Sequence, residues 1–304
     1  MLAFLCKQLH RHIHSLWDGT EPETTILKVS NPNLKPETTV SETFGVVWSP
    51  STPLLKGFTA NVDYWRVERN GTVYSSAQDV LDRYWGTHQA PGPANGTPAT
   101  GGLNTAQEGV LYDSAGNLLA VTAPYHNSGQ TIAKGIDMGA GYLLETANLG
   151  RFDFTAGATY LWSYRQSLVA GTPLVEMVNQ DASQGQGMDG YVRWKGKASV
   201  NWSRRRLSAE VVANYQSGFQ DFNYDNNGNL YSFEVASMIT FDFQASYALS
   251  GKYLADTKVT VGVLNALDRA PPFASGSQSN SVGYPGFMYD PTGRFVYVQL
   301  TKRF

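Results

Sequence analysis

The chain has 304 residues, of which 42% are hydrophobic, 12% aromatic and 16% charged, whereas about a quarter of the residues in an ordinary soluble domain are charged. The formal net charge of −2 at pH 7 excludes the basic field that attracts nucleic acid. The single cysteine, Cys6, excludes an intramolecular disulfide and a cysteine-based zinc cage.

Residues 1–30 come first and carry no recognisable processing signal. The run MLAFLC has no basic residues before it and no small-residue cleavage site after it, which argues against a signal peptide. His10, His12 and His14 alternate in HRHIH, but no carboxylate or thiol stands among them, so the pattern favours a solvated basic stretch over a metal site.

From residue 39 onward, apolar and polar residues alternate with the period of two that is typical of β-strands. In MITFDFQASYAL, for example, Phe241, Phe243 and Ala245 share one face, while Asp242 and Gln244 share the other. This pattern predicts nine strands, most of them as long as a strand that crosses a membrane: residues 39–50, 57–68, 130–145, 152–165, 190–202, 207–216, 238–249, 257–265 and 293–303.

The connections between these strands alternate strictly between short and long. A meander that crosses one slab puts every second connection on the same side, and outer-membrane barrels keep their periplasmic turns short and their external loops long. A Greek-key sandwich has no reason to follow this rule. We therefore predict an all-β fold, an antiparallel meander of about nine long strands that forms part of a transmembrane β-barrel.

The long loops are rich in Gly, Pro, Asn, Ser and Thr, and three of them contain an Asp-x-x-Gly turn that begins at Asp113, Asp225 or Asp290. Each turn resembles the closure of a small hairpin. Four aromatic residues in or beside the first long loop are candidate stacking platforms for a solute, although they could equally pack within the loop. They are Tyr84, Trp85, Tyr112 and Tyr125.

The sequence contains no recognisable catalytic motif. The five histidines stand outside any Gly-x-Ser-x-Gly elbow or His-Glu-x-x-His helix. The segment DFNYDNNGN departs from the EF-hand pattern, because Asn226 and Ser232 stand where that pattern requires Gly and Glu. We predict no catalytic residue, no metal site and no cofactor.

Several segments carry a resemblance to a known family. NPNLKPETTVSETFGVVW at 31–48, GFTANVDYWRVE at 57–68, KVTVGVLNALDRAPP at 258–272 and the final GRFVYVQLTKRF resemble the barrel of TonB-dependent outer-membrane receptors. The resemblance covers residues 31–304 as the C-terminal portion of the barrel, while residues 1–30 match nothing and are expected to be disordered or artefactual. It implies the outer membrane of a Gram-negative cell and active uptake of a large scarce solute of the siderophore, saccharide, peptide or cobalamin class.

The resemblance also implies partners. Receptors of this family have a barrel of about 22 strands closed by a plug, so the nine strands are expected to be an incomplete barrel whose link to the TonB system lies in a missing N-terminal part. Phe304 resembles the terminal aromatic that the barrel assembly machinery reads, and outer-membrane lipid would cover the apolar faces. The alternatives are a soluble β-rich carbohydrate-binding module and a passive porin.

Overall fold

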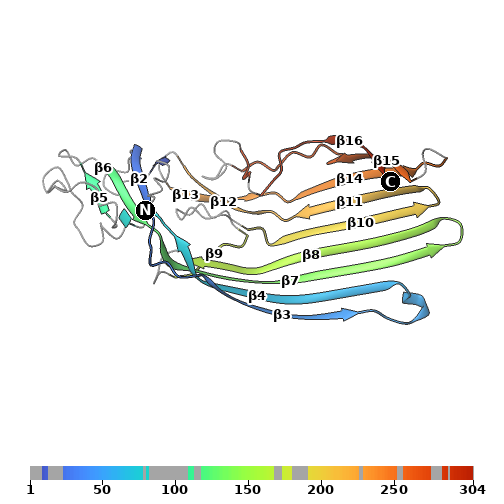
Figure 1. The fold of residues 1–304 in the computed structure, drawn as a ribbon, viewed down its shortest axis with the longest axis horizontal. Helices are drawn as coiled ribbons and strands as arrows, with labels where there is room; N and C mark the ends of the chain where they lie inside the picture. Colours follow the sequence, from blue (N-terminus) through green and yellow to red (C-terminus); the bar gives the residue numbers. More distant parts are fainter. Residues whose placement is uncertain are drawn as a thin grey trace. The chain divides into compact units, whose positions relative to one another are not determined.

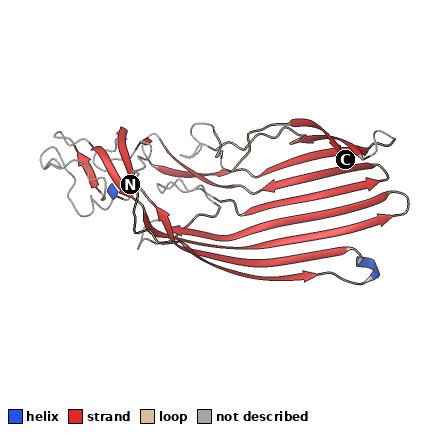
Figure 2. Cartoon of the chain, in the orientation of Figure 1, coloured by secondary structure: helices blue, strands red, loops and turns tan. Residues whose placement is uncertain are grey.

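The computed structural model describes residues 9–12, 23–77, 80–81, 109–112, 118–167, 173–179, 191–225, 229–251, 256–274, 283–286 and 288–303. These residues are mostly β-strand (Figure 2). Besides the 3-10 turn Pro53–Leu55, the structure contains the following strands: β1 (Leu9–His12), β2 (Glu23–Val29), β3 (Thr38–Trp48), β4 (Phe58–Tyr74), β5 (Gly109–Tyr112), β6 (Leu118–Pro124), β7 (His126–Thr146), β8 (Gly150–Ser167), β9 (Val175–Glu176), β10 (Trp194–Arg204), β11 (Leu207–Gln216), β12 (Phe219–Tyr224), β13 (Leu230–Val235), β14 (Met238–Ala248), β15 (Thr257–Leu264) and β16 (Phe295–Lys302).

The main sheet confirms the nine predicted strands and their meander. Its order is β3, β4, β7, β8, β10, β11, β14, β15, β16, so each long strand pairs with its neighbours along the chain, and the short β9 pairs with β8. The colours of Figure 1 accordingly follow the sequence from β3 to β14 across the sheet. Short and long connections alternate as predicted.

Two strands, β4 and β7, extend at one end well beyond their predicted bounds. β4 continues to Tyr74, and β7 begins at His126, because the pair Asn70 and Gly71 does not end the strand as its turn-like sequence suggests. Gly71 takes a positive φ of 71°, which glycine tolerates, and its carbonyl oxygen accepts a hydrogen bond of 2.8 Å from the Asn127 side chain. The chain therefore stays extended through a glycine.

The chain divides into two compact units. The first comprises Met1–Val40, Glu68–Thr131 and Gln166–Leu174, and the second comprises Ser41–Val67, Ile132–Arg165 and Val175–Phe304. Strands β10, β11, β14, β15 and β16 belong entirely to the second unit, whereas β3, β4, β7 and β8 contribute residues to both.

The first unit contains a small sheet that the sequence pattern did not predict. Its order is β1, β2, β6, β5, with β2 parallel to β6 and the other pairs antiparallel. Val121 and Ala123, both fully buried, pack with Ile26, Val80 and Leu81 in its core. β5 and β6, which flank the predicted turn at Asp113, pair antiparallel, while the turn itself lies outside the described residues. β1 and β2 lie within residues 1–30, and the domain boundary at residue 31 stays a prediction.

The second unit has two chemically different sheet faces, which we call the apolar face and the polar face. One row of directly paired residues on the apolar face crosses six strands: Val298, Val261, Ala245, Ala209, Trp202 and Phe152. The neighbouring row lies on the polar face: Tyr297, Gly262, Gln244, Glu210, Asn201 and Asp153.

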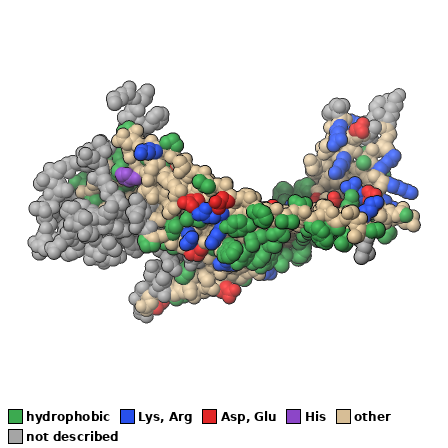
Figure 3. Space-filling view, turned by 90° about the horizontal axis from the view of Figure 1, so that it is seen from below, with side chains coloured by type: hydrophobic (Ala, Val, Ile, Leu, Met, Phe, Trp, Pro, Cys, Tyr) green, Lys and Arg blue, Asp and Glu red, His purple; other side chains and the backbone are tan. Residues whose placement is uncertain are grey.

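The apolar face is exposed. Val298 is 71% exposed, Val261 50% and Phe243 41%, although each side chain would be worth about 1.5–3 kcal/mol if fully buried. Figure 3, which views the chain from below, shows apolar side chains gathered in a patch on the surface. An exposed patch of this kind marks a surface that is covered by another apolar medium or partner.

The strands of the second unit are joined by short turns at one end, and one of the two hairpins predicted in its long loops forms. The described residues of the short connections, 49–57, 147–149, 205–206, 249–251 and 256, lie together at one end of the strands (Figure 2). β12 and β13 form the hairpin predicted at Asp225, whose carboxylate accepts hydrogen bonds from the Asn229 backbone and side chain at 2.9 and 3.0 Å. The hairpin predicted at Asp290 is wrong, because that carboxylate caps the Thr292 amide at 2.8 Å in a segment that leads directly into β16.

Candidate functional site

A cavity of about 650 Å³ lies in the second unit, where β10, β11 and β14 meet the segment that precedes β16. Its polar wall is built by Lys195, Asn214, Gln216, Thr240, Asp242 and Asn265. Met238, Met288, Tyr289 and Phe295 add apolar and aromatic surface, and Asp290 and Thr292 also line the cavity. Strand alternation places Asn214 and Gln216 on one face of β11, directly opposite Thr240 and Met238 of β14.

Asp242 is a carboxylate of this wall that is hydrogen-bonded through both of its oxygens. One carboxylate oxygen accepts a hydrogen bond of 2.9 Å from the Asn214 amide, and the other accepts one of 2.8 Å from the Asn265 backbone. Asn265 also joins Arg269 through two hydrogen bonds of 2.9 Å. These contacts hold the carboxylate in a fixed orientation beside the cavity.

Tyr289 and Gln216 supply polar atoms whose hydrogen bonding is incomplete. The Tyr289 hydroxyl and the Gln216 amide nitrogen are buried, and neither has a hydrogen-bond partner of good geometry among the described residues. Burial raises the pKa of the Tyr289 hydroxyl, and the facing Gln216 side chain opposes part of that shift. Because a buried polar atom without a partner costs about 1–3 kcal/mol, a ligand oxygen that reached this pair would be stabilised.

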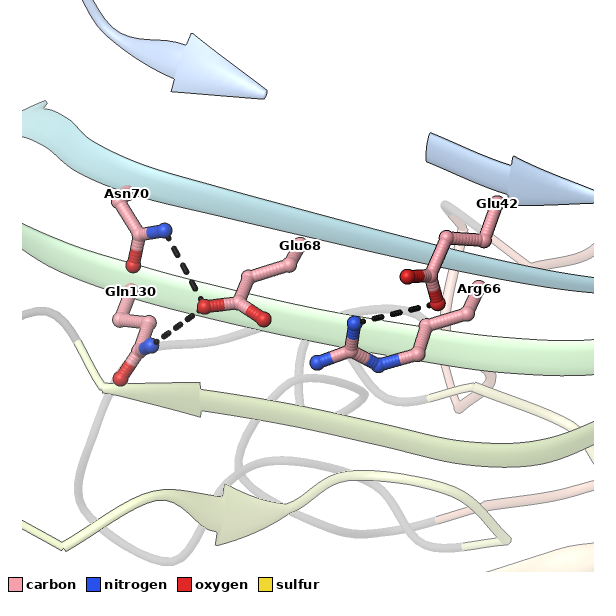
Figure 4. A network of polar contacts seen from close by, with 5 residues as sticks. All are labelled: Glu42, Arg66, Glu68, Asn70 and Gln130. Carbon is pink, nitrogen blue, oxygen red and sulfur yellow. Dashed lines mark hydrogen bonds and ion pairs between the residues drawn. The ribbon is translucent and has the colours of Figure 1, made fainter. Parts of the chain in front are cut away.

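Two groups of polar contacts mark other parts of the chain (Figure 4). In the second unit, Arg66 of β4 pairs with Glu42 of β3 at 3.4 Å. In the first unit, the Glu68 carboxylate accepts hydrogen bonds from Asn70 at 3.2 Å and from Gln130 at 3.3 Å. Each group joins neighbouring strands, and neither contributes to the cavity described above.

The structure places only part of the predicted site. Tyr84, Trp85 and Phe304 lie outside the described residues, and for Tyr112 the structure gives only its backbone at the end of β5. Tyr125 is half-buried between β6 and β7, with the Lys28 ammonium 5.9 Å from its ring centre. Its carbonyl oxygen accepts a hydrogen bond of 2.9 Å from Asn31. The role of these aromatic residues in solute contact stays a prediction.

The sequence interpretation missed Tyr289 and Gln216. Tyr289 is a loop aromatic next to an Asp-x-x-Gly turn, so the criterion that selected Tyr84 and Trp85 applies equally to it. Gln216 ends the polar face of a predicted strand, and no local signal marks it as different from other such residues.

The described residues hold no group of three or more His, Cys, Asp or Glu side chains that could bind a metal ion. No helix among them is long and apolar enough to cross a membrane.

Comparison with known proteins relates the fold to a family. The family model described as "TonB dependent receptor-like, beta-barrel" matches residues 15–266. A search of curated proteins gave no match.

Solved structures share the fold at low sequence identity. The outer membrane transporter YddB from Escherichia coli is 12% identical with a TM-score of 0.58, and the match covers 91% of this chain and 34% of that one. The siderophore receptor PirA from Acinetobacter baumannii is 17% identical with a TM-score of 0.54, over 92% of this chain and 33% of that one. The FrpB iron transporter from Neisseria meningitidis is 15% identical with a TM-score of 0.53, over 91% and 33%.

The chain thus spans about a third of the length of these structures. Since the family model matches most of the sequence and the observed sheet is the predicted meander, the chain belongs to the TonB-dependent receptors, within their β-barrel domain.

Proposed function

We propose that residues 31–304 form part of the barrel wall of an outer-membrane receptor that takes up a large solute actively. The observation that carries this proposal is the two-faced sheet of the second unit, with Val298, Val261 and Phe243 exposed on one side and a hydrogen-bonded polar face on the other. Lipid would cover the apolar face, and the polar face would line the interior.

The cavity beside Tyr289 and Asp242 is the proposed solute contact within this chain. It lies at the end of the strands from which the long connections leave, and in outer-membrane barrels the long loops face the outside of the cell. The aromatic residues Tyr84, Trp85, Tyr112 and Tyr125 would add contacts from the first long loop. The likeness to the siderophore receptor PirA and to a ferric enterobactin receptor in complex with enterobactin supports an iron chelate as one solute class.

The proposed partners follow from the same arrangement. The barrel assembly machinery would read the last strand, β16, and Phe304 at its end. We assign the contact with the TonB system to a part of the receptor other than residues 31–304. The proposal includes no enzymatic step, because the cavity brings together amide, hydroxyl and carboxylate groups without a nucleophile and its base.

Fractionation and energised uptake test this function. Membranes from Gram-negative cells that express the full gene product are separated by density, and uptake of radioactive ferric chelates is measured with and without a protonophore. We expect the protein in the outer-membrane fraction and uptake that stops when the proton gradient collapses. Recovery in the soluble fraction without detergent would favour the carbohydrate-binding module, and uptake that persists with the protonophore would favour a passive porin.

A further inference from the structure

The long and short connections of the main sheet carry opposite charge. The long connections, 75–125, 168–193, 217–237 and 265–294, contain twelve Asp and Glu against four Lys and Arg, a formal net charge of −8. The short connections, 49–57, 147–149, 205–206 and 249–256, contain four Lys and Arg against one Asp, a net charge of +3. Among the described residues of the second unit, the long connections contain six Asp and Glu against three Lys and Arg, a formal net charge of −3. An antiparallel meander puts these connections at one end of the sheet, so that end of the second unit is acidic.

The cavity at that end also carries a net negative charge. Its charged side chains are Lys195, Asp242 and Asp290, which leaves one negative charge in excess. Asp290 is exposed at the cavity wall, and its carboxylate accepts only local bonds from Thr292 among the described residues. The remaining polar groups, on Asn214, Gln216 and Tyr289, are uncharged donors and acceptors.

Both observations disfavour an anionic solute. A ligand with several negative charges would approach an acidic surface, which lowers its association rate, and would find one ammonium group in the cavity wall to offset its desolvation. An uncharged or cationic solute would not be repelled by the acidic surface. It would also bring no negative charge whose desolvation the cavity must offset. Amide and hydroxyl groups of the solute would complete the hydrogen bonds that Tyr289 and Gln216 lack.

We propose that this receptor selects a solute without net negative charge and rich in hydroxyl or amide groups, which contacts the cavity formed by Gln216, Tyr289, Asp242 and Asp290. The inference rests on the proposed function as a solute receptor. Two sources share this chemistry, namely a ferric hydroxamate that is neutral or positive and a neutral oligosaccharide.

Binding to the full gene product in detergent distinguishes these sources. Four probes are titrated by calorimetry: a cationic ferric hydroxamate, an uncharged ferric hydroxamate, a trianionic ferric catecholate and a neutral oligosaccharide. We expect the catecholate to bind at least about tenfold more weakly than the better of the hydroxamates and the oligosaccharide. The tighter of those two classes identifies the source.

Substitutions at the cavity refine the test. Tyr289→Phe and Gln216→Leu should each weaken the preferred probe by about tenfold, whereas Tyr231→Phe, at an exposed tyrosine of β13, should leave it unchanged. For the cationic probe, Asp290→Asn should weaken binding by about threefold and Lys195→Gln should strengthen it by a similar factor. Asp256→Asn, in a short connection, is the matched control for charge.

The outcomes separate the two levels of the proposal. Tightest binding of the anionic catecholate, or binding of the neutral probes that ignores both Tyr289→Phe and Gln216→Leu, would overturn the selectivity while leaving a receptor in place. Absence of binding by all four probes, in a protein that keeps the far-UV circular dichroism of β-strands and a heat-shifted compact gel band, would overturn the selectivity together with the proposed function.

Discussion

The ring of Tyr297 on β16 lies over Gly262 on β15, its directly paired residue. A Cβ atom added at Gly262 would stand 2.3 Å from Cζ of that ring, so only glycine leaves room for it. The Tyr297 hydroxyl then donates a hydrogen bond of 3.2 Å to Gln244 of β14. One side chain thus ties together the last three strands of the main sheet.

Replacing Gly262 should therefore loosen the last strands. In Gly262→Ala the added methyl group must displace the tyrosine ring, and we expect a loss of about 1–3 kcal/mol in unfolding free energy. Urea unfolding of the full gene product in detergent, followed by gel mobility, measures this change. Gly109→Ala is the matched control, because an added Cβ there meets no atom within 4 Å. Equal stability of the two variants would contradict the packing role of Tyr297.

Cysteines placed at two neighbouring residues of β14 should differ in whether they face lipid. Phe243 lies on the apolar face and Gln244 on the polar face, so a cysteine at Phe243 should react with a lipid-phase reagent and one at Gln244 should not. The background is Cys6→Ser, which removes the single native thiol. Preferential labelling at Gln244 would reverse the assignment of the two faces.

A charge on the apolar face should impair insertion. Val200 lies near the middle of β10 opposite Val211, and we expect Val200→Lys to cost about 2–4 kcal/mol in a bilayer. Asn201→Lys places the same charge on the polar face at the same depth and should cost much less. Refolding yields into vesicles, measured for both variants, check the difference. Similar yields would argue that lipid does not cover Val200.

These relationships differ in how far the sequence predicts them. The faces of Phe243 and Gln244 follow from local alternation, since a strand must send successive side chains to opposite sides. The small sheet of the first unit does not follow from local alternation, because β2 pairs with β6 across β3, β4 and most of the first long loop. Parallel pairing of this kind leaves no local signature. Tyr289 was missed for a similar reason: its burial depends on where the segment before β16 folds, and not on its own neighbours in sequence.

Tyr289 should also give the protein a pH dependence in the alkaline range. Burial raises the pKa of its hydroxyl above the ordinary value of 10.0, so the unfolded chain releases this proton at a lower pH than the folded protein. The stability linked to Tyr289 is fully present below pH 10 and is lost as the pH rises through the folded-state pKa.

Thermal unfolding of the wild type and of Tyr289→Phe between about pH 9 and pH 12 measures this contribution, because the other tyrosines affect both proteins alike. We expect the melting temperature of the wild type to fall more steeply with pH than that of the variant. The two curves should run parallel below pH 10 and converge or cross above it. Parallel curves over the whole range would mean that the Tyr289 hydroxyl is as solvated in the folded protein as in the unfolded chain, and the cavity wall would then have to be open at that residue.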